Sequence, residues 1–217
     1  SPYASDKPEL FIAPYKAANI YLSQLSVDGR TLDLNQVPVS SLFNEYFGNG
    51  MNGVVFQELR EARGLAYSAY ADYSSDEMRL NSPYSFLTYI ISQNDKLKDC
   101  MEAFDSICNY MPLSPSAFDQ AKTSLLKQIE QRRYVRSAPI GSYIAMVKNG
   151  WDHDYYKEIY EEVQRLTLDD VVAFQKARVA NRTYRYLVLG NKKDLDMKYL
   201  KSRGKVKKLS TKDIFVY

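Results

Sequence analysis

The order of extended and helical segments along the chain is the feature that most constrains the fold. Two aromatic and β-branched segments, residues 67–73 and 84–92, follow each other across the polar loop SSDEMRLNSP and predict two adjacent strands. Most of the other predicted strands are separated from the next one by helices. This order predicts an α+β fold, a mixed or antiparallel sheet with helices on one face.

Hydrophobic periodicity and turn residues predict the remaining elements. Asn52 is expected to cap a helix that Gly64 ends in the left-handed conformation, and Thr167 is expected to cap a later helix with Asp169 and Asp170 in its first turn. Residues 1–16 contain three prolines and no clear period, so we expect an entry arm or linker before a single domain at residues 17–217. Further strands are predicted at residues 18–25, 184–190 and 205–209, the last at a sheet edge. Helices are predicted at residues 36–47, 52–64, 95–111, 114–134, 140–148, 155–163, 167–179 and 194–201.

The charge balance gives no sign of a polyanionic partner. Lysine and arginine number 29 against 26 aspartates and glutamates, which leaves a net charge of +3. The one basic run, KYLKSRGKVKK at residues 198–208, is short and interrupted by apolar residues. We interpret it as a solvated face; the alternative, a nucleic-acid module, would require salt-dependent binding to DNA or RNA.

No transmembrane segment is expected, because no apolar run is long enough to cross a bilayer. The start SPYASDKPEL lacks the features of a signal peptide, and Ser1 is not a methionine, so we expect a fragment or a processed product. Cys100 and Cys108 fall about 12 Å apart along one predicted helix. That separation is too long for a disulfide, so both are expected to be small core residues.

Metal and nucleophile chemistry lack their usual residues in this chain. The single histidine, His153, lies in a polar turn and is interpreted as a surface residue, because catalytic zinc usually takes three protein ligands. A serine or cysteine nucleophile is excluded unless His153 serves as its base. The glycine-rich residues 48–53 follow a helix and lack Gly-Lys-Ser/Thr, so a tight turn is preferred to a phosphate site. A solvated face is preferred for the carboxylates Glu158, Glu161 and Glu162.

Arg60 and Tyr67 are the candidate site residues of this chain. They stand seven residues apart in FQELREARGLAYSAY, on either side of Gly64. Arginine offers five fixed donors and tyrosine one hydroxyl, so together they could hold a peptide carbonyl or the oxyanion formed from it. Physical reasoning alone favours a plainer interpretation, in which Arg60 stabilises the helix C-terminus and Tyr67 is a half-buried strand residue.

A family resemblance is clearest at residues 43–74, FNEYFGNGMNGVVFQELREARGLAYSAYADYS. This stretch closely resembles the C-terminal, non-metal-binding domains of the pitrilysin, insulin-degrading enzyme and mitochondrial processing peptidase family of zinc peptidases. Looser patterns continue the resemblance. The segment from Ser114 to Lys122 resembles the family's E-x-AK helix, and LTLDDVVAFQKARV with YRYLVLGNKKDLD resembles its terminal helix and strand. The resemblance covers most of residues 17–217.

The resemblance implies a processing-peptidase-like metallohydrolase domain with an antiparallel-rich sheet. It also implies that two such halves enclose a chamber for peptides, and that the catalytic half carries His-x-x-Glu-His, a distant glutamate and a zinc ion that activates water. The matching helix here, Ser41–Phe47, contains no histidine, and Glu45 alone cannot hold zinc. We therefore expect no cofactor in this chain, no hydrolysis by it alone, and zinc in a catalytic domain of the same parent chain or of a partner subunit.

Arg60 and Tyr67 match the arginine and tyrosine that the non-metal half of the family contributes across the chamber. Their implied role is to bind peptide substrate and to help stabilise the tetrahedral intermediate at the partner's zinc site, as auxiliary residues of a metalloendopeptidase. The alternative is a catalytically inactive scaffold or peptide-binding subunit of the same fold. For a bacterial parent, the resemblance implies a periplasmic or cell-envelope location.

Overall fold

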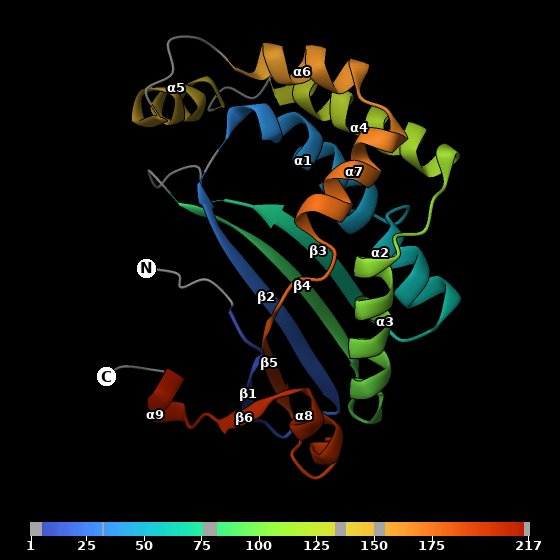
Figure 1. The fold of residues 1–217 in the computed structure, drawn as a ribbon, viewed down its shortest axis with the longest axis vertical. Coiled ribbons are helices and arrows are strands. Elements are labelled where there is room, and N and C mark those ends of the chain that lie inside the picture. The colour runs from blue at the N-terminus through green and yellow to red at the C-terminus, as the bar shows by residue number, and fades with distance from the viewer. Residues whose placement is uncertain (1–5, 32, 76–81, 133–137, 150–154, 215–217) are drawn as a thin grey trace.

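One mixed sheet with helices packed against it forms the frame of the molecule (Figure 1). The computed structural model describes residues 6–31, 33–75, 82–132, 138–149 and 155–214. The strands within these ranges are β1 (Glu9–Pro14), β2 (Asn19–Thr31), β3 (Ser68–Ser74), β4 (Pro83–Gln93), β5 (Arg185–Gly190) and β6 (Lys205–Lys208). The α-helices there are α1 (Val37–Phe43), α2 (Val54–Phe56), α3 (Leu97–Asn109), α4 (Pro115–Arg132), α5 (Ala138–Asn149), α6 (Tyr156–Arg165), α7 (Leu168–Arg178), α8 (Met197–Arg203) and α9 (Thr211–Ile214). Shorter helical turns are the 3₁₀ turns η1 (Leu34–Gln36) and η4 (Asn94–Lys96) and the π-helical turns η2 (Asn44–Gly48) and η3 (Gln57–Ala62).

The strands lie in the order β3-β4-β2-β5-β1-β6. β4 pairs antiparallel with β3 and β2, and β2 pairs antiparallel with β5, whereas β1 is parallel to both β5 and β6. β3 and β4 are the two adjacent strands that the sequence predicts, and β6 lies at a sheet edge as expected. The predicted α+β fold with an antiparallel-rich mixed sheet is therefore confirmed.

The N-terminal segment differs from the predicted entry arm or linker at residues 1–16. Glu9–Pro14 form strand β1 inside the sheet, between β5 and β6. Leu10 and Ile12 are buried in the core, so this part of the segment packs with the sheet. The prolines are compatible with a strand because Pro8 precedes it and Pro14 ends it, and both positions tolerate a missing backbone N–H.

The helices cover one face of the sheet. In β4, every second side chain from Tyr84 to Ser92 is buried, whereas the side chains between them are only partly covered. β2 alternates in the same way from Ile20 onward. The less covered face includes Tyr70 and Leu187, which are 38% and 39% exposed. A period of two with one buried face is the pattern of a sheet that is covered on one side.

Aromatic side chains join the helical layer to the sheet. The ring of Phe43 in α1 stacks on Phe47 with centroids 5.0 Å apart, and it lies 5.3 Å from Phe174 of α7 and 6.3 Å from Phe86 of β4. Such ring pairs add stability beyond the area that they bury. The cluster fixes α1 and η2, and with them the chain that leads toward Arg60.

Two predictions about α3 and α7 are confirmed. Cys100 and Cys108 are free, buried thiols of α3. Thr167 caps α7 in a capping box with Asp170, because each side chain accepts a hydrogen bond from the other's backbone. Among the helices that the structure describes, none combines the length and the apolar character of a membrane-crossing segment.

Candidate functional site

Arg60 lies on the outer side of a short helix formed by α2 and η3. Leu59 is fully buried and anchors this helix to the core, whereas the side chain of Arg60 is 50% exposed. The guanidinium carbon of Arg60 lies 5.0 Å from the centroid of the Phe56 ring, and its Nε lies 3.9 Å from a carboxylate oxygen of Glu61. Both contacts are local and exposed, so they restrict the arginine without burying it.

The start of this helix differs from the prediction. Gly53, not Asn52, is the N-cap, and it makes no side-chain hydrogen bond to the helix. Its extended backbone packs against Asn49, whose carbonyl oxygen would lie 2.5 Å from any added Cβ. The close approach selects glycine at the cap position, and this tertiary contact overrides the capping preference of Asn52.

A tight turn connects Arg60 to the strand that follows. Gly64 has φ +61°, so it ends the helix in the left-handed conformation that the sequence predicts. The Gly64 N–H donates to the carbonyl of Arg60 at 3.1 Å, and the Leu65 N–H donates to the carbonyl of Leu59 at 2.8 Å. The hydroxyl of Ser92 donates to the Leu65 carbonyl at 2.5 Å. These bonds tie the turn to both the helix and β4.

Tyr67 lies immediately before β3 and is 56% exposed. Its backbone N–H donates to the carbonyl of Ile91 in β4 at 2.9 Å, which fixes the start of the strand pairing. Tyr67 is thus more exposed than a half-buried strand residue would be. Hydrogen bonds therefore anchor the chain on both sides of this turn, to the helix at Arg60 and to β4 at Tyr67, while the Arg60 side chain is 50% exposed and Tyr67 is 56% exposed.

Gly48, at the start of the glycine-rich stretch, forms a close-packed joint with β3. The backbone of Gly48 lies against β3 so tightly that an added Cβ would be 1.7 Å from the carbonyl oxygen of Ala71. Only glycine allows such an approach of helix backbone to strand. The joint sets the position of the helix that carries Arg60 relative to β3, which begins beside Tyr67.

Glu45, the carboxylate of the helix that matches the family's zinc-binding helix, is engaged in hydrogen bonds to α4. Glu45 of η2 accepts hydrogen bonds at one oxygen from the Ser124 hydroxyl at 2.7 Å and from the Gln128 side-chain amide at 3.0 Å. These bonds join η2 to α4. In the part of the chain that is described, no three His, Cys, Asp or Glu side chains gather where they could hold a metal ion. His153 lies outside the described residues.

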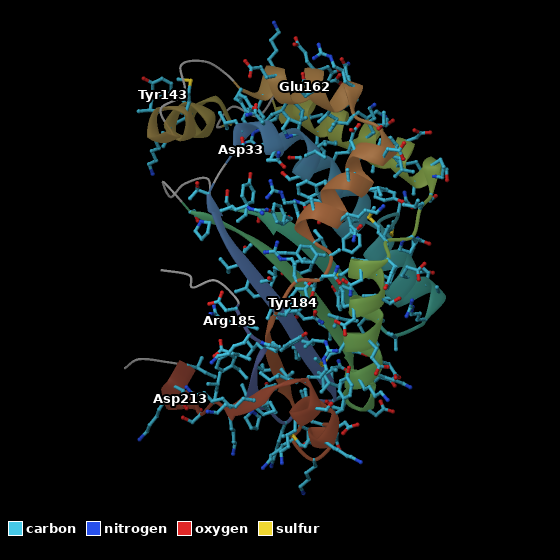
Figure 2. The ribbon with its side chains drawn as sticks, in the orientation of Figure 1. Asp33, Tyr143, Glu162, Tyr184, Arg185 and Asp213 are labelled. Carbon is cyan, nitrogen blue, oxygen red and sulfur yellow. The ribbon has the colours of Figure 1, made fainter. Side chains whose placement is uncertain are left out.

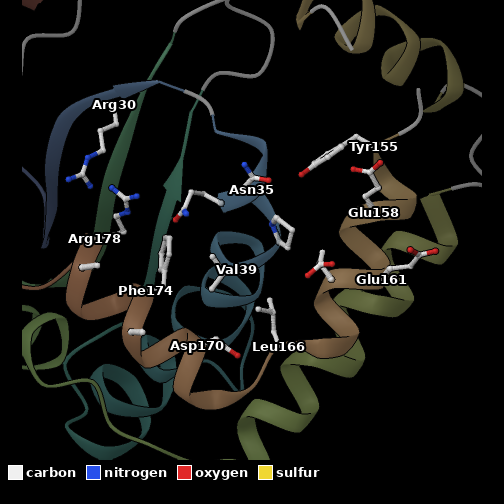
Figure 3. Close-up of a pocket in the computed structure, with 15 residues that line it drawn as sticks. Arg30, Asn35, Val39, Tyr155, Glu158, Glu161, Leu166, Asp170, Phe174 and Arg178 are labelled. Atoms are coloured by element: carbon white, nitrogen blue, oxygen red, sulfur yellow. The ribbon is translucent and has the colours of Figure 1, made fainter. Parts of the chain in front are cut away.

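A groove of about 900 Å³ lies between α1, α6 and α7, away from Arg60 and Tyr67, neither of which lines it. Figure 3 shows Glu158 and Glu161 on one side of the groove and Arg30 and Arg178 on the other. The acidic side is exposed, and Glu161 lies 3.8 Å from Lys157. This is the solvated face that the sequence predicts, and the groove supplies no group to the arginine–tyrosine turn.

Solved structures share this fold. The crystal structure of a peptidase M16 inactive domain from Pseudomonas fluorescens has a TM-score of 0.70 at 19% identity, over 85% of this chain and 43% of that one. A conserved protein from Enterococcus faecalis V583 gives 0.71 at 14% identity over 88% and 43%, and a protease from Helicobacter pylori gives 0.69 at 14% over 87% and 46%. A search of curated proteins found no match.

The fold and the family to which the sequence matches define an inactive, non-catalytic domain of the M16 peptidases. Residues 14–125 match the family model described as the peptidase M16 inactive domain, which is about half of the chain. The chain belongs to this family, and the predicted membership of the pitrilysin-like peptidases is confirmed. The chain spans less than half the length of each of the three solved relatives.

Proposed function

We propose that this chain acts as one domain, the non-catalytic half of a zinc metalloendopeptidase, and that it contributes Arg60 and Tyr67 to a peptide site completed by a catalytic zinc-binding domain. The observation that carries the proposal is the exposure of both side chains on a single hydrogen-bonded turn. A side chain that contributes to a site formed with another domain needs a fixed backbone and a side chain that is accessible from outside its own domain. Both residues meet that requirement.

The chemistry of the two groups suits a peptide carbonyl. In peptide hydrolysis, negative charge develops on the carbonyl oxygen as water adds to the carbon, and fixed donors aimed at that oxygen lower the barrier. The Arg60 guanidinium supplies charged N–H donors, and the Tyr67 hydroxyl supplies a neutral one. The zinc of the partner domain would supply the activated water. This chain would bind the substrate backbone and stabilise the oxyanion.

The test uses the complete enzyme that contains this domain. Arg60→Ala and Tyr67→Phe should each lower kcat by about 10²- to 10³-fold, the usual cost of losing one oxyanion donor, while the zinc content stays unchanged. Arg63→Ala is a matched control, since Arg63 is also an exposed arginine of the same turn and pairs with Glu58 at 3.4 Å. Unchanged peptidase rates in both test variants would contradict the roles proposed for Arg60 and Tyr67.

The second candidate function is an inactive scaffold or peptide-binding subunit. One observation favours it: Arg60 already contacts Phe56 and Glu61 within its own helix, so its position has a local explanation that needs no substrate. The two functions separate in the parent gene and its neighbour. If neither encodes His-x-x-Glu-His, labelled unfolded peptides should still bind to the domain without being cleaved, and Arg60→Ala should weaken that binding.

A further inference from the structure

Helix α5 exposes a continuous row of apolar side chains. Ile140, Tyr143, Ile144 and Val147 recur at the spacing i, i+3, i+4 and i+7, so they share one side of the helix. They are 65%, 62%, 40% and 57% exposed. Figure 1 shows α5 at the margin of the molecule, and Figure 2 places Tyr143 on its periphery. We call these four side chains the α5 stripe.

The α5 stripe differs from the other exposed apolar side chains of the described residues. Met51, Tyr110 and Leu113 are also exposed, but they lie on turns or beyond helix ends; Tyr70 and Leu187 lie on separate strands, and Ile214 ends the four-residue helix α9, so none of them belongs to a row on one helix. Scattered exposed apolar residues are normal on protein surfaces, whereas a row on one helix face marks an interaction site. α5 is also short, and Gly141 lies inside it. A helix of about 12 residues is marginal in water unless its apolar face packs against something.

The composition of α5 argues against a lipid surface as the occupant. A helix that lies on a membrane combines its apolar side with a polar side rich in lysine and arginine. The only charged residue in the α5 sequence APIGSYIAMVKN is Lys148. The stripe therefore suits an apolar protein surface rather than anionic headgroups.

The size of the stripe argues for a partner that is held nearby. Four side chains cover far less than the roughly 800 Å² per partner of a stable interface between free proteins, so a second copy of this chain would not dimerise through the stripe alone. A domain in the same polypeptide has an effective concentration in the millimolar range, which makes a small contact sufficient. This chain covers 43%, 43% and 46% of the three solved relatives, so more than half of each relative's length is left for such a domain.

We propose that the α5 stripe docks in an apolar groove of the zinc-binding catalytic domain carried by the same parent polypeptide. The identity of that domain rests on the proposed function. The spacing of the four side chains is that of helix-in-groove recognition, in which one helix face supplies the anchors. Tyr143 lies in the middle of the stripe and combines a large apolar ring with a hydroxyl that can stay at the wet rim, which makes it the main anchor.

Hydrogen exchange of the α5 amides tests the docking in the parent polypeptide that carries both halves. These amides should exchange about tenfold more slowly in the parent than in this chain alone, because docking suppresses local opening. The double variant Tyr143→Ser/Ile144→Ser should restore the fast exchange. Tyr110→Ser is the matched control, since Tyr110 is 81% exposed and lies outside α5, and it should leave the slow exchange unchanged.

Several results would overturn the proposal. They are equally fast α5 exchange in the parent and in the chain alone, slow exchange in the chain alone that depends on its concentration, and protection by vesicles of phosphatidylglycerol and phosphatidylcholine. None of these readouts needs turnover, so they are independent of the roles of Arg60 and Tyr67. Protection of α5 by a second half without His-x-x-Glu-His would overturn the proposed function and the named partner, but not the docking surface.

Discussion

The side-chain amide of Asn44 holds the backbone of Tyr73 with two hydrogen bonds. Its Nδ2 donates to the Tyr73 carbonyl at 3.0 Å, and its Oδ1 accepts from the Tyr73 N–H at 2.8 Å. Tyr73 belongs to β3, which lies at the edge of the sheet. An open strand edge offers unpaired N–H and C=O groups to other chains, and Asn44 closes this part of it. The same contact fastens η2 to the strand that begins beside Tyr67.

Replacing Asn44 with alanine should destabilise the fold by about 2–3 kcal/mol, because the variant leaves one backbone donor and one acceptor without partners in a partly buried place. Urea unfolding should show a lower midpoint with an unchanged slope. Asn52→Ala, at an exposed position, is the control and should change the free energy of unfolding by less than about 0.5 kcal/mol. Equal stabilities of the two variants would contradict a stabilising role for the two hydrogen bonds between Asn44 and Tyr73.

Gly48→Ala should cost about 3 kcal/mol, at the upper end for overpacking, because the added methyl would meet the Ala71 carbonyl oxygen and not a movable side chain. Gly50→Ala separates this effect from glycine flexibility. Gly50 has φ +71° and open space around it, so only backbone strain of about 1–2 kcal/mol is expected there. Thermal melts of both variants give the comparison, and a milder effect at position 48 than at position 50 would argue against the close-packed joint.

The capping box of α7 should make stability depend on acidic pH. Hydrogen bonds from the Thr167 hydroxyl and N–H, at 2.7 and 2.8 Å, lower the pKa of Asp170 below its ordinary value of 3.8. A lowered pKa in the folded state stabilises the fold above the ordinary pKa, and this contribution is lost as pH falls from 3.8 through the folded value. Asp170→Asn should reduce the dependence of the melting temperature on pH in that range. A variant that keeps the full wild-type slope would exclude Asp170 as its source.

The two cysteines should be inert in the native protein. Burial raises the pKa of Cys100 to about 11 and that of Cys108 to about 12, so almost no thiolate exists at neutral pH, and both side chains are fully covered. A thiol reagent at pH 8 should label no cysteine in buffer and both in denaturant. Fast labelling of the native chain would show that α3 opens locally.

Periodic segments and local turn chemistry were predictable from sequence, because their signals come from neighbouring residues. Gly64 ends its helix as predicted, and Thr167 caps α7 as predicted. β1 was missed because Pro8 and Pro14 suggest a linker, while its burial comes from β5 and β6, far along the chain. Parallel pairing of distant segments leaves little local trace.

At the candidate site, too, local features were predictable from the sequence and features that depend on distant contacts were not. The turn between Arg60 and Tyr67 follows from the helix signals and Gly64, but the exposure of Tyr67 depends on how the turn is bonded to β4. The lack of histidine near Glu45 is visible in the sequence. The hydrogen bonds of Glu45 to Ser124 and Gln128 are not, because those residues lie about eighty positions away on α4. Tertiary contacts of that kind require the structure.

Phe56 supports Arg60 and gives a graded test of the proposed site. The ring lies 5.0 Å from the guanidinium carbon, and an exposed cation–π contact contributes about 0.5–1 kcal/mol. If that contact orients Arg60 toward substrate, Phe56→Leu in the complete enzyme should lower kcat by about 2- to 5-fold, which is the same free energy expressed as a rate. Arg60→Ala should lower kcat much further, and Phe56→Leu should cost nothing more in its presence, since the ring would act only through the arginine. Kinetics of the single and double variants check this, with zinc content and melting temperature measured alongside. Additive losses would mean that Phe56 acts on substrate or stability by another route.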